Sequence, residues 1–265
     1  MSDVVDAFRS PDSPSASTSK KPRGSWFLRA LAVVAIGVLL VGLLLPATRS
    51  ARPAAYRMQC ANNLKQIGLA LLNYEDVYGT LPPAYIANAD GTPMHSWRVL
   101  ILPFLEQGAL YKQYRFDEPW NGPNNSRMAD QIPSIYRCPS FSPQHDRNAE
   151  PTDSALHTPY VVLCDENTPF PGSRAMSISE IKDGASETLA VAEVDSECVP
   201  WMAPRDIDVA GFARVLNKSK HRRQHTGGLH AAMVNGTVRF ISQTIDRDML
   251  HQLSTASGGE APNDF

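Results

Sequence analysis

The chain has 265 residues, a formal net charge of −2 and 43 % hydrophobic residues. These values suit one folded domain of ordinary size, and the lack of excess positive charge argues against a general nucleic-acid-binding protein. The four cysteines, Cys60, Cys138, Cys164 and Cys198, form no CxxC pair, which argues against zinc-ribbon and thioredoxin-like proteins.

The N-terminal region predicts a tail and a membrane helix. Residues 1–25 are rich in Ser and Pro without apolar periodicity, so we predict a disordered cytoplasmic tail. Residues 26–45 are apolar on every face apart from Arg29, and at 1.5 Å per residue they extend about 30 Å, the thickness of a bilayer core. This predicts a single transmembrane helix with the lipid bilayer as its partner. Because long domains cross membranes largely regardless of charge, residues 46–265 are expected to form an extracytoplasmic, periplasmic domain.

A second helical pattern follows the membrane segment. Apolar residues recur at spacings of three and four, which is typical of one face of an amphipathic helix, and the pattern stops near Gly79. We therefore predict that the membrane helix continues into a soluble amphipathic helix. Its apolar face consists of Tyr56, Cys60, Leu64, Ile67, Leu71 and Tyr74.

The predicted strands are short and come later in the chain. Residues 97–105 (WRVLILPFL) form a buried segment, and residues 188–194 (TLAVAEV) alternate as a strand does. The clearest prediction is a hairpin over 229–241, because Asn235-Gly236 is typical of a type I′ turn between two strands. A short helix capped by Thr244 is expected to follow. With residues 117–186 read as long loops and short irregular strands, the fold class is α+β, with the long N-terminal helix packed on a small antiparallel sheet.

The candidate chemistry is sparse. His221, His225 and His230 lie close together, and imidazoles suit zinc, but no HExxH pattern accompanies them. No GxSxG nucleophile motif and no phosphate-binding glycine loop occurs either. We therefore predict no catalytic residue, no metal and no cofactor, and hence a protein that is not an enzyme. Carboxylates are read as solvated surface groups. These are Asp165, Glu166, Asp183, Glu193 and Asp195.

Two further residue groups have alternative interpretations. Trp97, Trp120 and Trp201 are read as core residues or as a sugar-stacking face. In an oxidising compartment we expect at least one disulfide. Four cysteines allow three complete pairings, and Cys164–Cys198 is favoured because both cysteines flank predicted strands.

Several runs carry a resemblance to a known family. They are the segment from VVAIGVLLVG to GTLPPAY at residues 33–85, SWRVLILPFLEQGALY at 96–111, RCPS at 137–140, ISEIKDGASETLAVAEV at 178–194, VPWMAPRDID at 199–208 and HTGGLHAAMVNGTVRF at 225–240. Together they resemble a large bacterial family of unknown function, abundant in planctomycetes. Its members have an N-terminal helix like that of type II secretion pseudopilins and a C-terminal motif of His, nine residues and Asp-Gly.

The resemblance implies a membrane-anchored, pseudopilin-like structural or assembly protein whose partners include other pseudopilin-like subunits. It assigns structural roles to Asp183 and Gly184 and to the C-terminal motif. The motif residues are His225, Gly227, Gly228, Asn235 and Gly236. The alternatives are an extracytoplasmic glycan-binding module and, third, a metal-dependent enzyme.

The sequence departs from the family pattern at two positions. Arg29 stands where a processed prepilin, cleaved after Gly24, would carry glutamate, so a repulsive charge replaces an attractive one. Asn235 replaces the aspartate of the C-terminal motif, which preserves a turn but removes a charge that could bind calcium.

Overall fold

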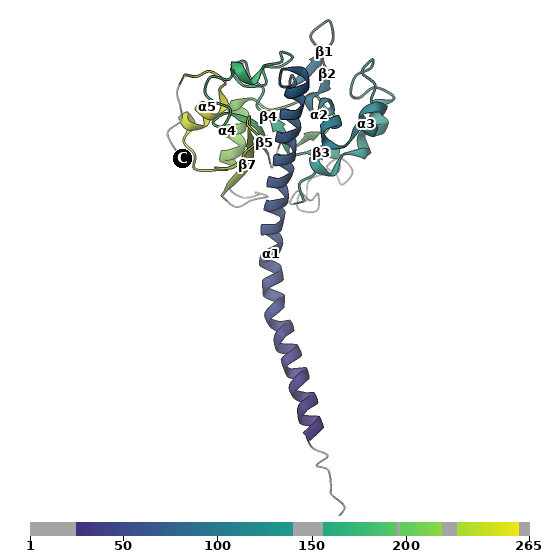
Figure 1. The fold of residues 1–265 in the computed structure, drawn as a ribbon, viewed down its shortest axis with the longest axis vertical. Helices are drawn as coiled ribbons and strands as arrows, with labels where there is room; N and C mark the ends of the chain where they lie inside the picture. The colour runs from purple at the N-terminus through teal and green to yellow at the C-terminus, as the bar shows by residue number, and fades with distance from the viewer. Residues whose placement is uncertain (1–24, 140–155, 195–196, 219–226, 260–265) are drawn as a thin grey trace, which may run out of the picture. The chain divides into compact units, whose positions relative to one another are not determined.

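The computed structural model describes residues 25–139, 156–194, 197–218 and 227–259 (Figure 1). The chain divides into two units, residues 1–50 and 51–265. The helices are α1 (Ser25–Tyr78), α2 (Trp97–Leu100), α3 (Gly108–Gln113), α4 (Val209–Lys218) and α5 (Arg247–Ser254). The strands are β1 (Tyr85–Ala87), β2 (Pro93–Ser96), β3 (His157–Thr158), β4 (Tyr160–Val162), β5 (Leu189–Glu193), β6 (Val199–Pro200), β7 (Gly228–Met233) and β8 (Val238–Ser242).

The strands form small antiparallel sheets. β1 pairs with β2, β3 pairs with β6, and four strands form a sheet in the order β4-β5-β7-β8. The predicted α+β class with a small antiparallel sheet is therefore confirmed. The predicted tail lies outside the described residues except for Ser25, where α1 begins.

The predicted membrane-spanning helix over residues 26–45 is wrong. Within the described parts of the chain, no helix is both long enough and apolar enough to cross a bilayer. α1 runs as one helix of 54 residues from Ser25 to Tyr78.

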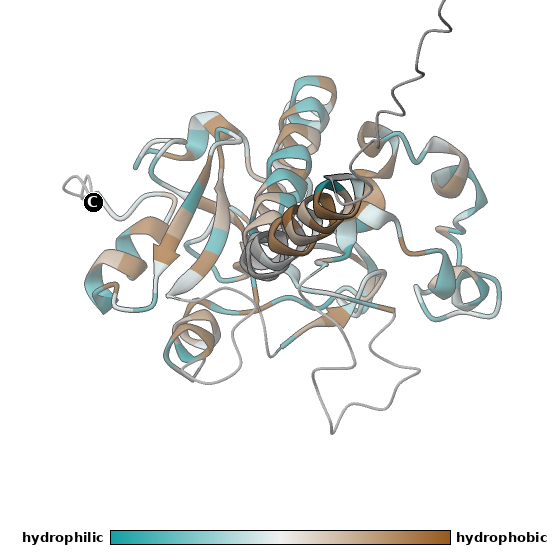
Figure 2. Cartoon of the chain, turned by 90° about the horizontal axis from the view of Figure 1, so that it is seen from below, coloured by the Kyte–Doolittle hydropathy of each residue, from teal (hydrophilic) through white to brown (hydrophobic). Residues whose placement is uncertain are grey.

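Within the second unit, the later part of α1 is amphipathic as predicted. Cys60, Leu64, Ile67 and Leu71 are buried on one face. In Figure 2 α1 is brown over its first described part and mixed brown and teal further along. The helix stops at Tyr78 because Gly79 adopts a positive φ of 76° and turns its backbone N–H back to the Glu75 carbonyl.

The four-stranded sheet buries both faces, because alternate side chains of each strand enter different cores. On one side, which we call the α1 face, Tyr160, Val162 and Ala232 pack with Leu64 and Ile67 of α1. The opposite side, the α4–α5 face, packs against α4 and α5 (Figure 1). Its strand and helix residues include Val161, Leu163, Leu229, Ala231, Phe212, Val215, Leu250 and Leu253. A sheet covered on both sides explains why β5 is buried at every residue instead of alternating.

Several local predictions need correction. The segment 97–105 is helical and is buried only over residues 97–102, and its first helix begins where Ser96 caps α2 by accepting a hydrogen bond from the Arg98 backbone N–H. Helix α4 was not predicted. Helix α5 is capped by the carboxylate of Asp246 instead of Thr244. The hairpin of β7 and β8 is confirmed, but Asn235 does not have a positive φ, so its turn is not type I′.

Candidate functional site

The sequence runs SWR and APRD meet in a buried ion pair at the edge of β4 that does not pair with β5. Arg98 Nη2 lies 2.6 Å from Asp206 Oδ1, and the two side chains are 0 % and 2 % exposed. The same oxygen accepts hydrogen bonds from Trp97 Nε1 at 3.1 Å and from the Val162 backbone N–H at 2.9 Å. Arg98 Nε donates to the Tyr160 carbonyl at 2.9 Å. One ion pair thus fixes α2, β4 and the segment before α4 to one another.

Burial raises the pKa of the Asp206 carboxyl, and the Arg98 guanidinium opposes that shift. Removing two charges from water is costly, and the pair compensates only because each charge is held by further hydrogen bonds. Such a pair defines which segments pack together more than it adds net stability. The ion pair forms hydrogen bonds with backbone groups of the protein itself, which is typical of a pair that has a structural role.

A neighbouring hydrogen bond network ties α1 to the same core. Asn63 Nδ2 donates to the Arg137 carbonyl at 2.9 Å and to Tyr160 Oη at 3.3 Å. Burial raises the pKa of the Tyr160 phenol far above its ordinary value, so this hydroxyl stays neutral. Together these contacts link α1 to β4 and to the segment that carries Cys138.

The disulfide joins Cys60 of α1 to Cys138, with Cα atoms 5.6 Å apart. The expectation of at least one disulfide is confirmed, but the favoured Cys164–Cys198 pairing is wrong, since both of these cysteines are thiols. Cys164 follows β4 and Cys198 precedes β6, so proximity to strands did not bring them together. The pairing that forms instead fastens the amphipathic helix to the loop region that packs on it.

Glu193 lies beside this disulfide and is fully buried. Its Oε2 is 3.5 Å from Nδ1 of His230, whose side chain is 14 % exposed. One ligand-type atom from each of Cys60, Cys138 and Glu193 falls within 4.8 Å of the others. The reading of Glu193 as a solvated surface acid is therefore wrong, whereas Asp165 and Glu166 are exposed as expected; Asp195 lies outside the described residues.

The C-terminal motif is described in part, because His221 and His225 lie outside the described residues. Gly227 has a φ of 95°, and a Cβ at Gly228 would overlap the carbonyl oxygen of Ile241 on β8. Gly236 has a φ of 80° and completes a loop in which its N–H bonds the Met233 carbonyl. Asn235 Oδ1 accepts hydrogen bonds from Thr237 N at 3.0 Å and Thr237 Oγ1 at 2.7 Å. Each of these described residues supports the hairpin.

Asp183 and Gly184 also have visible structural contacts. The Asp183 carboxylate accepts hydrogen bonds from the backbone N–H groups of Gly258 and Gly259 at 2.6 and 3.0 Å and from Thr255 Oγ1 at 3.1 Å. Gly184 has a φ of 95° and its carbonyl accepts from Glu187 N at 3.0 Å. Asp183 thereby holds the segment after α5, and Gly184 makes the turn that leads to β5.

The tryptophans do not form an exposed sugar-stacking face. Trp97 and Trp201 are 0 % and 1 % exposed and belong to the α1-face core, while Trp120 is partly buried against it. Trp201 Nε1 donates to the Ala129 carbonyl at 3.0 Å, which satisfies its only donor. The core interpretation of these three residues holds.

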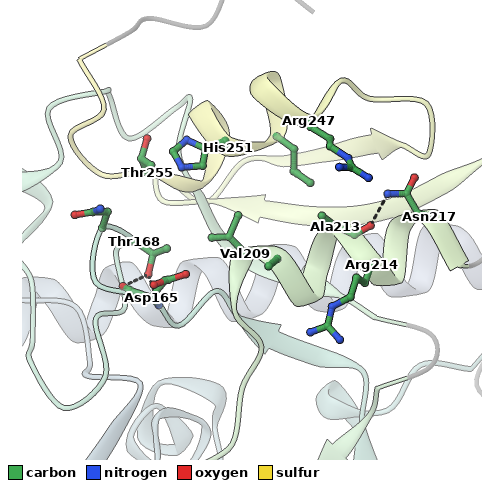
Figure 3. A pocket seen from close by; sticks show the side chains of 12 residues that line it. Asp165, Thr168, Val209, Ala213, Arg214, Asn217, Arg247, His251 and Thr255 are labelled. Carbon is green, nitrogen blue, oxygen red and sulfur yellow. Dashed lines mark hydrogen bonds between the residues drawn. The ribbon is translucent and has the colours of Figure 1, made fainter.

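A cavity of about 600 Å³ lies between α4, α5 and the loop after β4 (Figure 3). Arg214, Arg247 and His251 lie along it, with Asp165 and Thr168 on the loop side (Figure 3). Its apolar lining comes from Val209, Ala210, Ala213 and Leu250. Nothing in the sequence predicted this cavity, because α4 was not predicted and α4 forms one wall.

Two charged residues whose buried positions were not predicted share one sequence feature, which is that each lies inside an apolar run. Arg98 interrupts WRVLILPFL and Glu193 interrupts TLAVAEV. A charge within a fully buried segment requires a partner, which the sequence alone does not name.

The fold and its buried network thus define an α+β domain in which a long helix packs on a sheet and is covalently fixed to the segment that carries Cys138. A family model described as a protein of unknown function (DUF1559) matches residues 49–206, more than half of the chain. The chain belongs to this family. No curated protein matches it, and no solved structure does. The matched region contains the ion pair and the disulfide, while the C-terminal motif lies outside it.

Proposed function

We propose that this protein is a non-enzymatic, pseudopilin-like structural or assembly protein of the cell envelope. The observation that carries the proposal is the exposed apolar surface at the start of α1. Leu31, Val34 and Leu39 are 69 %, 63 % and 64 % exposed, and their neighbours are similar. An exposed patch of this size marks a site of contact with another protein or with lipid. We assign it to packing against further pseudopilin-like subunits and to contact with the lipid bilayer.

The covalent chemistry of the domain supports a location outside the cytoplasm. Structural disulfides form and persist in oxidising compartments and are rare in the cytosol. Cys60 and Cys138 are 0 % and 3 % exposed and join segments 78 residues apart in the sequence. The buried charges Arg98 and Asp206 are bonded within the protein, which supports a structural role for the best-formed polar centre.

The test compares the assembly state of two variants of the full-length protein in mild detergent. Val34→Asp places a charge in the apolar surface, whereas Val77→Asp makes the same change at an equally exposed position, 62 % against 63 %, near the end of α1. Sedimentation and electron microscopy should show oligomers or filaments for the wild type and for Val77→Asp, and dispersed particles for Val34→Asp. A wild-type protein that is monomeric at all concentrations, or a Val34→Asp variant that assembles normally, would contradict the proposal.

One observation favours a second function, an extracytoplasmic module that binds an acidic glycan. The cavity beside α4 has two cationic side chains, Arg214 and Arg247, and the His251 imidazole over an apolar lining, which suits a sugar that carries a carboxylate. Calorimetry with an oligosaccharide that contains uronic acid, against its neutral counterpart, tests this function. Arg247→Ala should abolish binding and Arg174→Ala, at an exposed ion pair that does not line the cavity, should not. Equal binding of the neutral sugar would rule out the acidic-glycan function.

A further inference from the structure

The surroundings of the Cys60–Cys138 disulfide are unusual because a buried carboxylate lies next to it. Protein interiors accept a carboxylate only with compensating partners. Here Glu193 is 0 % exposed, and its ligand-type oxygen and the two sulfur atoms all lie within 4.8 Å of one another. Two cysteines and a carboxylate at such distances are a set of ligands that suits a small divalent metal ion.

A histidine lies next to this group on the adjacent strand. Glu193 of β5 and His230 of β7 both face α1, and His230 Nδ1 lies 3.5 Å from Glu193 Oε2. The His230 ring is not among the groups whose ligand atoms all lie within 4.8 Å of one another, so it would have to move towards the two sulfur atoms to complete the tetrahedral coordination that zinc prefers in structural sites. The ligands come from α1, from the segment after the 3-10 helix Ser134–Tyr136 and from two sheet strands, so a metal ion there would join the sheet to the two segments that the disulfide connects.

We propose that Cys60, Cys138, Glu193 and His230 form a zinc site when the disulfide is reduced. A dithiol reductant transfers two electrons and two protons to the disulfide, so the sulfur–sulfur bond breaks, two thiols form and the reductant is itself oxidised to a disulfide. Zinc then displaces the two thiol protons and binds the two sulfur atoms. The disulfide and the zinc site are thus alternative states of the same two cysteines. Each state fixes α1 to the segment that carries Cys138, the zinc site would also include two sheet strands, and redox conditions decide which state forms.

The site differs from the histidine cluster that the sequence offers. Of those three histidines the proposal uses only His230, and its other ligands come from three separate parts of the chain. Cys164 and Cys198 are thiols outside the site and would add nonspecific zinc binding. The experiment therefore uses full-length protein with Cys164→Ser and Cys198→Ser, which retains the Cys60–Cys138 disulfide.

Zinc content and affinity are measured with a chromophoric chelator, before and after reduction with a phosphine under anaerobic conditions. The reduced protein should bind one zinc ion per chain, and the oxidised protein should bind none. Cobalt(II) in place of zinc should give a thiolate-to-metal charge-transfer band and the visible bands of tetrahedral coordination. Absence of stoichiometric zinc in the reduced protein would overturn the proposal.

A carboxylate variant separates the metal site from general thiol binding. Glu193→Gln keeps the size of the side chain, and formation of the disulfide before reduction verifies that the variant folds. It should weaken zinc binding by at least about tenfold, since loss of a direct ligand exceeds the usual effect of outer-shell changes. Glu187→Gln, which removes an equivalent carboxylate paired with Arg239 on the protein surface, should leave zinc affinity unchanged. Equal affinity of Glu193→Gln and the parent protein would show that two thiols alone bind the ion, and would contradict the proposed site.

Discussion

The two faces of the four-stranded sheet are built differently. The α1 face contains a disulfide and the hydrogen bonds that Asn63 donates to Tyr160 Oη and to the Arg137 carbonyl, and a buried ion pair lies at the adjoining edge of β4. The α4–α5 face is closed by apolar side chains such as Phe212, Leu229 and Leu253. Burial of apolar side chains stabilises the fold without favouring particular partners, whereas ion pairs and disulfides specify which segments meet.

The difference shows where the fold of this family is specified. The disulfide, the Asn63 hydrogen bonds and the ion pair fall within the family-matched residues 49–206, and helices α4 and α5 follow that region. The α1 face therefore defines how the long helix docks on the sheet. The α4–α5 face completes the core and has the cavity beside it.

The largest expected effect comes from leaving one buried charge without its partner. Asp206→Leu would leave Arg98 charged and 0 % exposed, and should lower the free energy of unfolding by about 3–5 kcal/mol in urea titrations. The double variant Arg98→Met/Asp206→Leu should recover much of this loss, because it removes both charges. A double variant as unstable as the single one would show that the hydrogen bonds to backbone, and not the unpaired charge, dominate.

A cavity on the opposite face should cost somewhat less and should not depend on pH. Leu253 of α5 is fully buried on the α4–α5 face, so Leu253→Ala should lower the free energy of unfolding by about 2–5 kcal/mol through lost burial and an unfilled cavity. Urea titrations at two pH values should give the same difference between this variant and the wild type. A strong pH dependence would reveal ionic contacts on this face and would break the comparison.

The hairpin that closes the sheet beside α1 predicts a smaller effect. Gly236 has a φ of 80°, and a Cβ there would lie 3.1 Å from Leu72 Cδ1 of α1, so Gly236→Val should cost about 1–3 kcal/mol in thermal melts. Asn235→Asp is the matched control at the neighbouring position and should be almost silent, with or without calcium or zinc. A metal-dependent rise in the melting temperature of Asn235→Asp would instead indicate a metal-binding role for the motif.

The smallest effect is expected at a partly exposed ion pair near the sheet. Both Glu187 oxygens accept hydrogen bonds from Arg239 at 2.8 Å, and these bonds lower the pKa of the carboxyl below its ordinary value of 4.5. A lowered carboxyl pKa stabilises the folded state above pH 4.5, and this contribution is lost as the pH falls below that value. Glu187→Gln should cost about 0.5–1 kcal/mol at pH 7 and nothing in strong acid. An equal loss at both pH values would contradict an ionic origin.

The elements with strong local patterns were predictable from sequence. The spacing of Cys60, Leu64 and Ile67 gave the buried face of α1, and Asn235-Gly236 gave the hairpin, because both patterns depend on neighbours in sequence. The hairpin loop was still misjudged. A three-residue loop with Gly236 in the left-handed region replaces the two-residue turn, and both loops accept the same dipeptide.

The site depended on contacts that sequence spacing does not encode. The partner of Arg98 lies 108 residues away, and Cys60 pairs with a cysteine 78 residues away instead of remaining a core thiol. Helix α4 begins where the Asp208 carboxylate accepts a hydrogen bond from the Gly211 N–H at 2.6 Å. This helix was not predicted because Asp208 was considered only as the last residue of the family-like run at 199–208. The N-terminal apolar run suggested a membrane span from composition alone, and the described part of α1 does not bear this out.

The central claim, assembly through the start of α1, is tested most directly by cross-linking in intact cell envelopes. Val34→Cys and Val77→Cys would be introduced separately into the protein with Cys164→Ser and Cys198→Ser, so that each introduced thiol is the one available to a bifunctional maleimide. The account predicts that Val34→Cys forms cross-links, either between two chains of this protein or between it and another pseudopilin-like subunit. Val77→Cys should give only chains that are not cross-linked. Uncross-linked chains from both positions, at expression levels where the protein is folded, would contradict it.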